Sequence, residues 1–217
     1  MANQQNLKIS GMLNQHEFIE RYVFIKQRVT NGFTRSELAF LLGRSPNDVA
    51  DYEHFDAHVK MNYQDHEVMA AFFKKRATAA PIFQARVNDI DISSDKRMIR
   101  GTVVETDAQR IYDFIHPWKI KGENKPITIV EELGHDMTQD VLIRAFVEEH
   151  MAQLKAQGCF ERGCTALYLY QQLAGLICKA WQPLFLKILR VSIYARIHTQ
   201  EIRLHQVNGQ TIYKTKP

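Results

Sequence analysis

The stretch 33–53 constrains the fold more than any other part of the sequence, because it contains the start and stop signals of two short helices. Thr34 and Glu37 have the spacing of a capping box, which predicts a helix start. The apolar residues that follow at helical intervals are Leu38, Leu41 and Leu42. Gly43 ends this helix, and Ser45-Pro46 begins a second one almost immediately. Two helices joined by so short a turn cross steeply, as in a helix-turn-helix.

The same residues carry the pattern Thr-x-x-Glu-Leu-Ala-x-x-Leu-Gly-x-Ser, followed by an apolar residue four places after the Ser and a Glu eight places after it. With this pattern, the stretch from about 17 to 76 resembles the lambda-repressor-like (XRE) helix-turn-helix proteins. The resemblance implies a compact helical domain in which the second motif helix, from Ser45 to about His54, enters the major groove of DNA. The DNA-facing positions that it implies are Arg44, Ser45, Asn47, Asp48 and Asp51.

The face of this second helix is more acidic than is usual in that family, where Gln, Arg, Lys, Ser and Thr commonly read bases. Here the helix carries Pro46 and three acids, Asp48, Asp51 and Glu53. Phosphates repel a carboxylate, although a carboxylate can accept a hydrogen bond from the amino group of cytosine. Arg44 and Asn47 are therefore the expected base readers. The alternative is that the motif packs as a scaffold and touches no DNA.

The C-terminal third is predicted to contain three helices followed by a β-hairpin. Helical periodicity covers residues 140–157, 166–173 and 183–197. Two strand-like runs, 202–204 and 211–213, then flank Val207-Asn208-Gly209-Gln210, and Asn-Gly is the strongest short hairpin signal. This order of elements resembles winged-helix domains in general.

Basic residues concentrate in this third, with ten lysines and arginines against five acids in residues 138–217. On the helix that begins at Pro183, three side chains are spaced to share one face: Lys187, Arg190 and Tyr194. Further basic side chains follow on the hairpin, namely Arg203, His205, Lys214 and Lys216. Such a stripe suits phosphate contacts without base specificity. The alternative is a solvated basic face on a helix that only packs.

The middle of the chain has the character of short strands. The candidates are residues 98–105, 110–116 and 125–131, which predict a small antiparallel sheet. The aromatic stretch 112–118 either packs this sheet onto a neighbouring domain, through Phe114 and Trp118, or lines a ligand pocket with His116 and Trp118. The first ten or so residues are expected to be disordered, and residues 78–92 to form a linker.

Several classes of function are disfavoured by what the sequence lacks. No apolar run reaches the length of about 18 residues that spans a bilayer, and the N-terminus has no apolar signal core, so we expect a cytoplasmic location. The three cysteines lack the spacing of a disulfide framework or a metal site: Cys159, Cys164 and Cys178. The common nucleophile, phosphate-loop and metalloprotease motifs are absent, so we expect no enzyme activity, metal or cofactor.

Together these patterns predict an α+β protein, mainly α, in three segments. They are a helix-turn-helix domain at 12–77, a linker with a small antiparallel sheet at 78–137, and a winged-helix-like domain at 138–217. The expected function is duplex DNA binding as a transcriptional regulator, as a homodimer because one short recognition helix gives little affinity alone. The alternative is a non-catalytic adaptor whose acidic helix face binds a protein partner.

Overall fold

The chain forms two compact units that are not continuous in sequence. The computed structural model describes residues 5–73, 94–118, 124, 126–134, 137–208 and 210–215. Unit 1 comprises Met1–Arg35 and Pro46–Gly134, and unit 2 comprises Ser36–Ser45 and His135–Pro217. The two motif helices therefore belong to different units, α2 (Arg35–Leu42) mainly to unit 2 and α3 (Pro46–Glu53) to unit 1.

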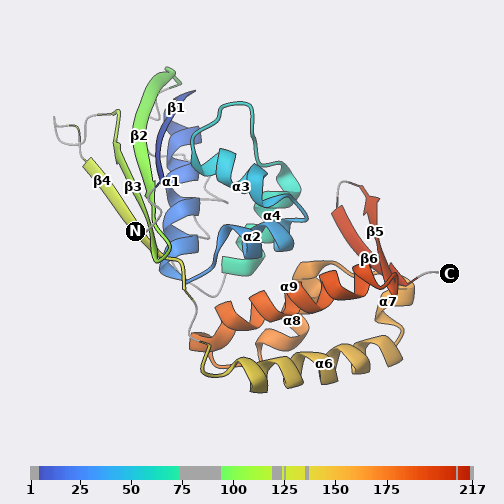
Figure 1. Ribbon diagram of the computed structural model, residues 1–217. Helices are drawn as coiled ribbons and strands as arrows, with labels where there is room; N and C mark the ends of the chain where they lie inside the picture. Colours follow the sequence, from blue (N-terminus) through green and yellow to red (C-terminus); the bar gives the residue numbers. More distant parts are fainter. Residues whose placement is uncertain are drawn as a thin grey trace. The chain divides into compact units, whose positions relative to one another are not determined.

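Unit 1 is built on a four-stranded antiparallel sheet with helix α1 (Gln15–Thr30) packed on one face (Figure 1). The strands lie in the order β1 (Gln5–Leu13), β2 (Arg97–Glu105), β3 (Gln109–Ile115) and β4 (Pro126–Glu132). The predicted antiparallel sheet is confirmed, since β2, β3 and β4 lie within one or two residues of the expected runs. The fold is thus α+β.

The prediction of a disordered N-terminus is wrong for residues 5–10, because they belong to strand β1. This strand pairs with β2 along its whole length, from Gln5 opposite Glu105 to Leu13 opposite Arg97. Ile9 and Leu13 point into the core, while Gln5, Asn6, Lys8 and Ser10 of the same strand are polar and exposed. A one-sided edge strand of this kind has too few apolar residues to be distinguished from a polar tail by composition.

The helices of unit 1 pack around an aromatic core. Phe18 of α1 contacts Phe55, Phe114 and Trp118 with ring centroids 5.9 Å away in each case. Amphipathic periodicity predicts a helix over 67–76, and helix α4 (Tyr63–Phe73) begins four residues earlier. The ring of its Phe72 lies 4.8 Å from that of Phe33. The predicted end of this helix, at Arg76, lies outside the described residues. The predicted linker 78–92 lies outside them as well.

Unit 2 contains helices α2, α6 (Asp140–Ala156), α7 (Cys159–Arg162), α8 (Ala166–Ala174), the 3-10 turn η1 (Lys179–Trp181) and α9 (Gln182–His198). The hairpin β5 (Ile202–Val207) and β6 (Gln210–Thr215) follows. Helices α2, α6, α8 and α9 and the hairpin lie where the sequence predicts them, whereas the short helix α7 and the turn η1 were not predicted. Cys164, between α7 and α8, forms a single antiparallel bridge with Tyr213, with backbone N to O distances of 3.1 and 2.8 Å.

Helix α2 packs inside unit 2 through Phe40. The Phe40 ring lies 5.9 Å from the ring of Tyr194 on α9 and 5.8 Å from that of Tyr213 on β6. Gly43 ends α2 with a φ of 66°, and Thr211 donates a hydrogen bond to its carbonyl oxygen at 3.1 Å. A Cβ at position 43 would lie 2.3 Å from Thr211 Oγ1, so both the backbone angle and the contact require glycine here.

These packing partners divide the chain differently from the three expected segments 12–77, 78–137 and 138–217. Strand β1 and the middle strands share a sheet that α1 covers, so that the expected first and second segments contribute to one unit. Residues 36–45 join the C-terminal unit instead. None of the described helices is both long and apolar enough to cross a membrane.

Candidate functional site: helix α3 and its anchoring network

Helix α3 is buried on one face and exposed on the other. Val49, Tyr52 and Glu53 are buried. Of the predicted DNA-facing residues on this helix, Asn47 and Asp51 are exposed and Asp48 is half-buried. The remaining two lie before the helix in unit 2, where Arg44 is half-buried and Ser45 is exposed. Glu53 is therefore not part of the acidic surface that the sequence predicts.

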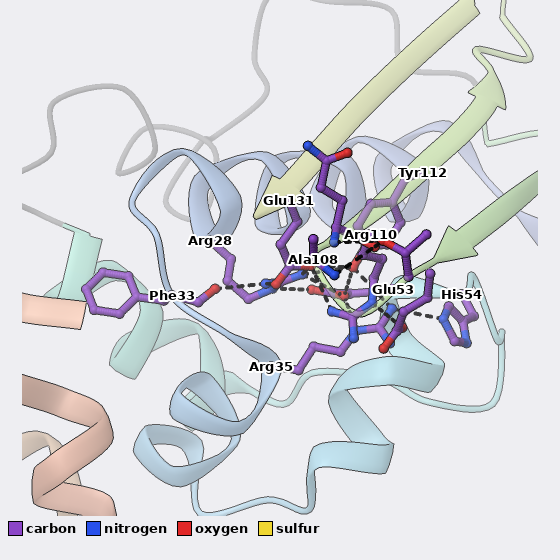
Figure 2. A network of polar contacts seen from close by, with 12 residues as sticks. Arg28, Phe33, Arg35, Glu53, His54, Ala108, Arg110, Tyr112 and Glu131 are labelled. Atoms are coloured by element: carbon purple, nitrogen blue, oxygen red, sulfur yellow. Dashed lines mark hydrogen bonds and ion pairs between the residues drawn. The ribbon is translucent and has the colours of Figure 1, made fainter. Parts of the chain in front are cut away.

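Glu53 instead accepts hydrogen bonds from two arginines (Figure 2). Arg28 of α1 binds both of its carboxylate oxygens, with Nε 2.6 Å from Oε1 and Nη2 3.0 Å from Oε2. The Arg35 Nε lies 2.6 Å from Oε2. Because the side chains of Arg28 and Glu53 are both fully buried, these bonds fix α3 against α1 without help from solvent.

The sheet completes this cluster, which we call the anchoring network. Arg28 also binds Glu131 of β4, and Arg110 of β3 lies 2.8 Å from the Glu131 Oε2. Tyr112 of β3 donates its hydroxyl hydrogen to the Glu53 Oε2 at 2.6 Å. In the described part of the chain the network joins three arginines to three glutamates, Arg28, Arg35 and Arg110 to Glu53, Glu105 and Glu131. Its charges therefore balance.

The network shifts the titration of its members. Burial acts to raise the pKa of Glu53, but the positive charges of Arg28 and Arg35 outweigh burial and lower this pKa to about 2. Burial, followed by the Glu53 charge, raises the pKa of Tyr112 well above its usual value. Burial and the neighbouring Arg35 lower the pKa of His54 to about 4. Arg35 lies 2.9 Å from the His54 Nε2, which fits a neutral ring that accepts this hydrogen bond.

A second set of polar contacts also holds the C-terminal end of α3. The Tyr52 hydroxyl donates to the Glu20 Oε1 at 2.9 Å, and the Arg21 Nη1 donates to the Tyr52 carbonyl oxygen at 2.8 Å. His66 of α4 lies 2.6 Å from the same Glu20 oxygen. Its hydrogen bond with Glu20 raises the pKa of His66. Helices α1, α3 and α4 are thus tied together through Glu20.

Sequence reasoning missed the anchoring network because its members are far apart along the chain. Arg28 and Glu131 are separated by 103 positions, and Glu53 and Tyr112 by 59. The available signal is the alternation in β3, where Arg110 and Tyr112 lie on the same side of the strand as Phe114. Polar side chains in register with a core residue indicate buried polar contacts, but not their partners.

The predicted basic face of α9 is partly covered by other parts of unit 2. Tyr194 contacts Phe40 of α2, and Lys187 lies 3.8 Å from the Met137 sulfur. The Arg190 Nε is buried without a hydrogen-bond partner among the described residues. Helical spacing predicts that Leu184, Ile188 and Val191 of this helix face the core. Leu184 and Ile188 are buried, but the prediction is wrong for Val191, whose side chain is 44% exposed.

The hairpin presents a pair of like charges. Arg203 of β5 and Lys214 of β6 are directly opposite in register, and both are exposed. His205 follows on the same side of β5 and is also exposed, while Lys216 lies outside the described residues. Like charges directly opposite on neighbouring strands repel each other, and a bound anion relieves that repulsion.

The aromatic stretch of β3 packs inside unit 1. His116 and Trp118 are buried, with the His116 ring 5.0 Å from Phe18 and its Nδ1 2.6 Å from the Trp118 carbonyl oxygen. Packing was therefore the better of the two sequence interpretations, although the partner is α1 of the same unit. All three cysteines are free, with Cys159 and Cys164 buried and Cys178 exposed.

No group of side chains suited to hold a metal ion was found among the described residues. Comparison of the chain with protein families, curated proteins and solved structures found no match. The resemblance of residues 17–76 to XRE proteins consequently remains a prediction, and the geometry of α3 and the hairpin is the basis for proposing a function.

Proposed function

We propose that the protein binds duplex DNA, with α3 in the major groove, and acts as a transcriptional regulator. The observation that carries the proposal is that α3 is buried on one face and exposed on the other. Its inner face is fixed by Val49, Tyr52 and Glu53, and its outer face presents Asn47 and Asp51. A recognition helix needs this arrangement, because base contacts require side chains held in place by a rigid support.

Each exposed residue of α3 suits a particular contact. Asn47 can donate to and accept from the edge of an adenine, and Asp48 and Asp51 can accept from the amino group of cytosine. The two acids also repel phosphates, so α3 by itself supplies little affinity. Further phosphate contacts are required, and Arg44 and Ser45 directly before the helix are suited to provide them.

The hairpin of unit 2 is the stronger source of phosphate contacts. Arg203 and Lys214 are exposed, adjacent and both positive. They read no sequence, so they add the same affinity to any duplex. Lys187 and Arg190 of α9 remain in the proposal as secondary contacts, while the packing of Tyr194 on Phe40 makes it the least suited of the predicted residues.

The test is fluorescence anisotropy of a labelled random-sequence duplex, titrated with the full chain at several salt concentrations. We expect affinity to fall linearly on a plot of log affinity against log salt, with a slope of roughly −0.9 per phosphate contact. The double variant Arg203→Ala/Lys214→Ala should make this slope shallower by about two contacts. The matched control is Lys179→Ala, which removes an exposed charge from η1. A folded protein that binds no duplex at low salt contradicts the proposal.

A second candidate, a protein-interaction adaptor, is favoured by exposed apolar side chains on unit 2. The side chains of Val141 and Leu142, neighbours at the start of α6, are 78% and 67% exposed. Adjacent exposed apolar side chains of this kind suit contact with a protein partner. The variant Asp48→Asn/Asp51→Asn separates the two functions. For DNA binding, loss of the two charges strengthens binding to random duplex. For the adaptor, the same variant leaves duplex binding absent and weakens capture of a protein partner.

A further inference from the structure

The face of the four-stranded sheet that points away from α1 is hollowed. Ile99, Val103, Tyr112 and Phe114 point into the core, so the residues between them lie on the opposite face. A groove of about 540 Å³ crosses this outer face, and residues of all four strands line it. We call it the sheet groove. Its volume lies within the range of about 300–1,000 Å³ that is typical of small-molecule sites.

The side chains of the sheet groove form two neighbouring rows. In the first row Lys8, Thr102, Asp113 and Thr128 lie opposite one another across the four strands. In the second row Ser10 lies opposite Arg100, and Ile115 lies opposite Pro126. The half formed by β1 and β2 therefore offers two cations and two hydroxyls. The half formed by β3 and β4 offers the apolar pair Ile115 and Pro126 beside the polar pair Asp113 and Thr128.

The two cations are placed to share one anion. Lys8 faces Thr102, and Arg100 is two residues before Thr102 on the same strand, so the cations are diagonal neighbours on one face. Both are exposed, and neither has a carboxylate partner among the described residues. Their mutual repulsion is relieved by a negative group bound between them, which the hydroxyls of Ser10 and Thr102 can also contact.

The other half of the sheet groove limits what the anion can be attached to. Ile115 is 55% exposed and Pro126 is exposed beside it, which suits an apolar group. Asp113 carries a negative charge in the same row as Lys8, and its Oδ1 accepts a hydrogen bond from Thr128 at 2.6 Å. A polyanion lying across all four strands would meet this carboxylate and the exposed Glu132 of β4.

We propose that the sheet groove binds a small organic anion, with its acidic group between Lys8 and Arg100 and its apolar body on Ile115 and Pro126. The shape and the charges both favour this class over a nucleic acid. The site is distinct from α3, which lies on the inner side of the sheet with the anchoring network. The proposal does not depend on whether the protein binds DNA.

The test uses three compounds with the same phenyl body: 3-phenylpropionate, phenyl phosphate and 3-phenylpropylamine. Each is titrated into the isotope-labelled full chain, and backbone amide shifts are followed by NMR. We expect at least one of the two anions to shift amides of β1 and β2 around Lys8 and Thr102, and the amine to leave them unchanged. The anion that binds more tightly identifies carboxylate or phosphate as the preferred acidic group.

Variants at the two exposed cations complete the test. Arg100→Gln and Lys8→Gln should each weaken binding of the anion by about 5- to 10-fold, because each removes a charge-assisted hydrogen bond from an exposed site. Lys179→Gln removes the same charge from unit 2 and should leave the affinity within 2-fold. Three results would overturn the proposal: equal binding of the amine, shifts confined to other elements, or unchanged affinity in Arg100→Gln. Both variants alter exposed side chains, so the amide spectrum will confirm that each remains folded.

Discussion

Helices α3 and α9 were both expected to contact DNA, but they are held in place by different kinds of interaction. Helix α3 has eight residues and is held mainly by charged and hydroxyl groups, with Glu53 bound to Arg28, Arg35 and Tyr112. Helix α9 has seventeen residues and is held by an apolar core. Its buried residues are Leu184, Phe185, Leu186, Ile188, Leu189, Ser192 and Ile193.

This difference assigns the two helices different tasks. Burial on several sides makes α9 mainly a structural helix. The surface that remains includes Val191 and Tyr194, which offer little to a phosphate, so that Lys187 and Arg190 are only secondary contacts in the proposal. A short helix such as α3 has too few apolar residues to be fixed by packing alone, so the anchoring network fixes its position. Hydrogen-bonded ion pairs specify one geometry, whereas apolar contacts tolerate small shifts.

The largest loss of folding stability is expected from breaking the anchoring network. Glu53→Gln leaves buried Arg28 short of a counter-charge, which typically destabilises a protein by about 3–5 kcal/mol. The chain has two tryptophans, one in each unit, so in a Trp181→Phe background the fluorescence of buried Trp118 reports on unit 1. Urea unfolding should show the loss in unit 1. Asp51→Asn, an exposed change on the same helix, should stay within about 0.5 kcal/mol of the parent.

Removing an apolar contact from unit 2 should lower folding stability somewhat less. Phe40→Ala deletes a buried ring that contacts Tyr194 and Tyr213, with an expected loss of about 3 kcal/mol. Tyr194 is half-exposed and can move into part of the cavity left by the missing ring. The expected loss is therefore at the low end of the usual range. Hydrogen exchange should show faster exchange in α9 and the hairpin. Equal acceleration throughout the β1–β4 sheet would contradict a separate core for unit 2.

Acid should destabilise unit 1 through the anchoring network, which unit 2 lacks. Glu53 has a pKa lowered to about 2 in the folded state, from a usual value of 4.5. A lowered pKa contributes stability that is present above pH 4.5 and is lost as the pH falls toward 2. Unit 1 should therefore lose roughly 2–3 kcal/mol over that window in urea titrations that follow Trp118. The same loss in Glu53→Gln would mean that other carboxyls cause it.

The smallest effect is expected at the hairpin, where stability should not change. Arg203→Ala removes an exposed charge opposite Lys214, so urea unfolding should match the parent within about 0.5 kcal/mol or show a slight gain. Duplex binding should lose about one phosphate contact, measured as a shallower salt dependence. A clear loss of stability would show that Arg203 supports the unit rather than a ligand.

The sequence predicted the local elements well and their association poorly. Capping, glycine and proline signals located α2 and α3, and the Asn-Gly turn located the hairpin, because these signals act within a few residues. The pairing of β1 with β2 joins residues about ninety positions apart, and the packing of α2 in unit 2 depends on Phe40 meeting Tyr194 and Tyr213. No local pattern carries that information.

At the candidate site, too, the sequence predicted local features but not the long-range contacts. Asn47 and Asp51 are exposed, as a DNA-facing role requires, and the resemblance to XRE proteins implied these positions. Glu53 lies on the same short helix and was counted with the acidic surface, yet it is buried because Arg28 and Arg35 supply two charges. A buried carboxylate differs from an exposed one only through its partners, which the fold must first bring together.

The most direct test of the whole account is selection of preferred duplexes from a random library by the parent, Asn47→Ala and Arg203→Ala proteins at one salt concentration. The account predicts a preferred sequence for the parent and relaxed preference at one base pair for Asn47→Ala, by about 1–3 kcal/mol. Arg203→Ala should retain the preference while binding all sequences more weakly. A parent protein that selects no sequence, or an Asn47→Ala variant with the parent's preference, would contradict the assignment of α3 as the recognition helix.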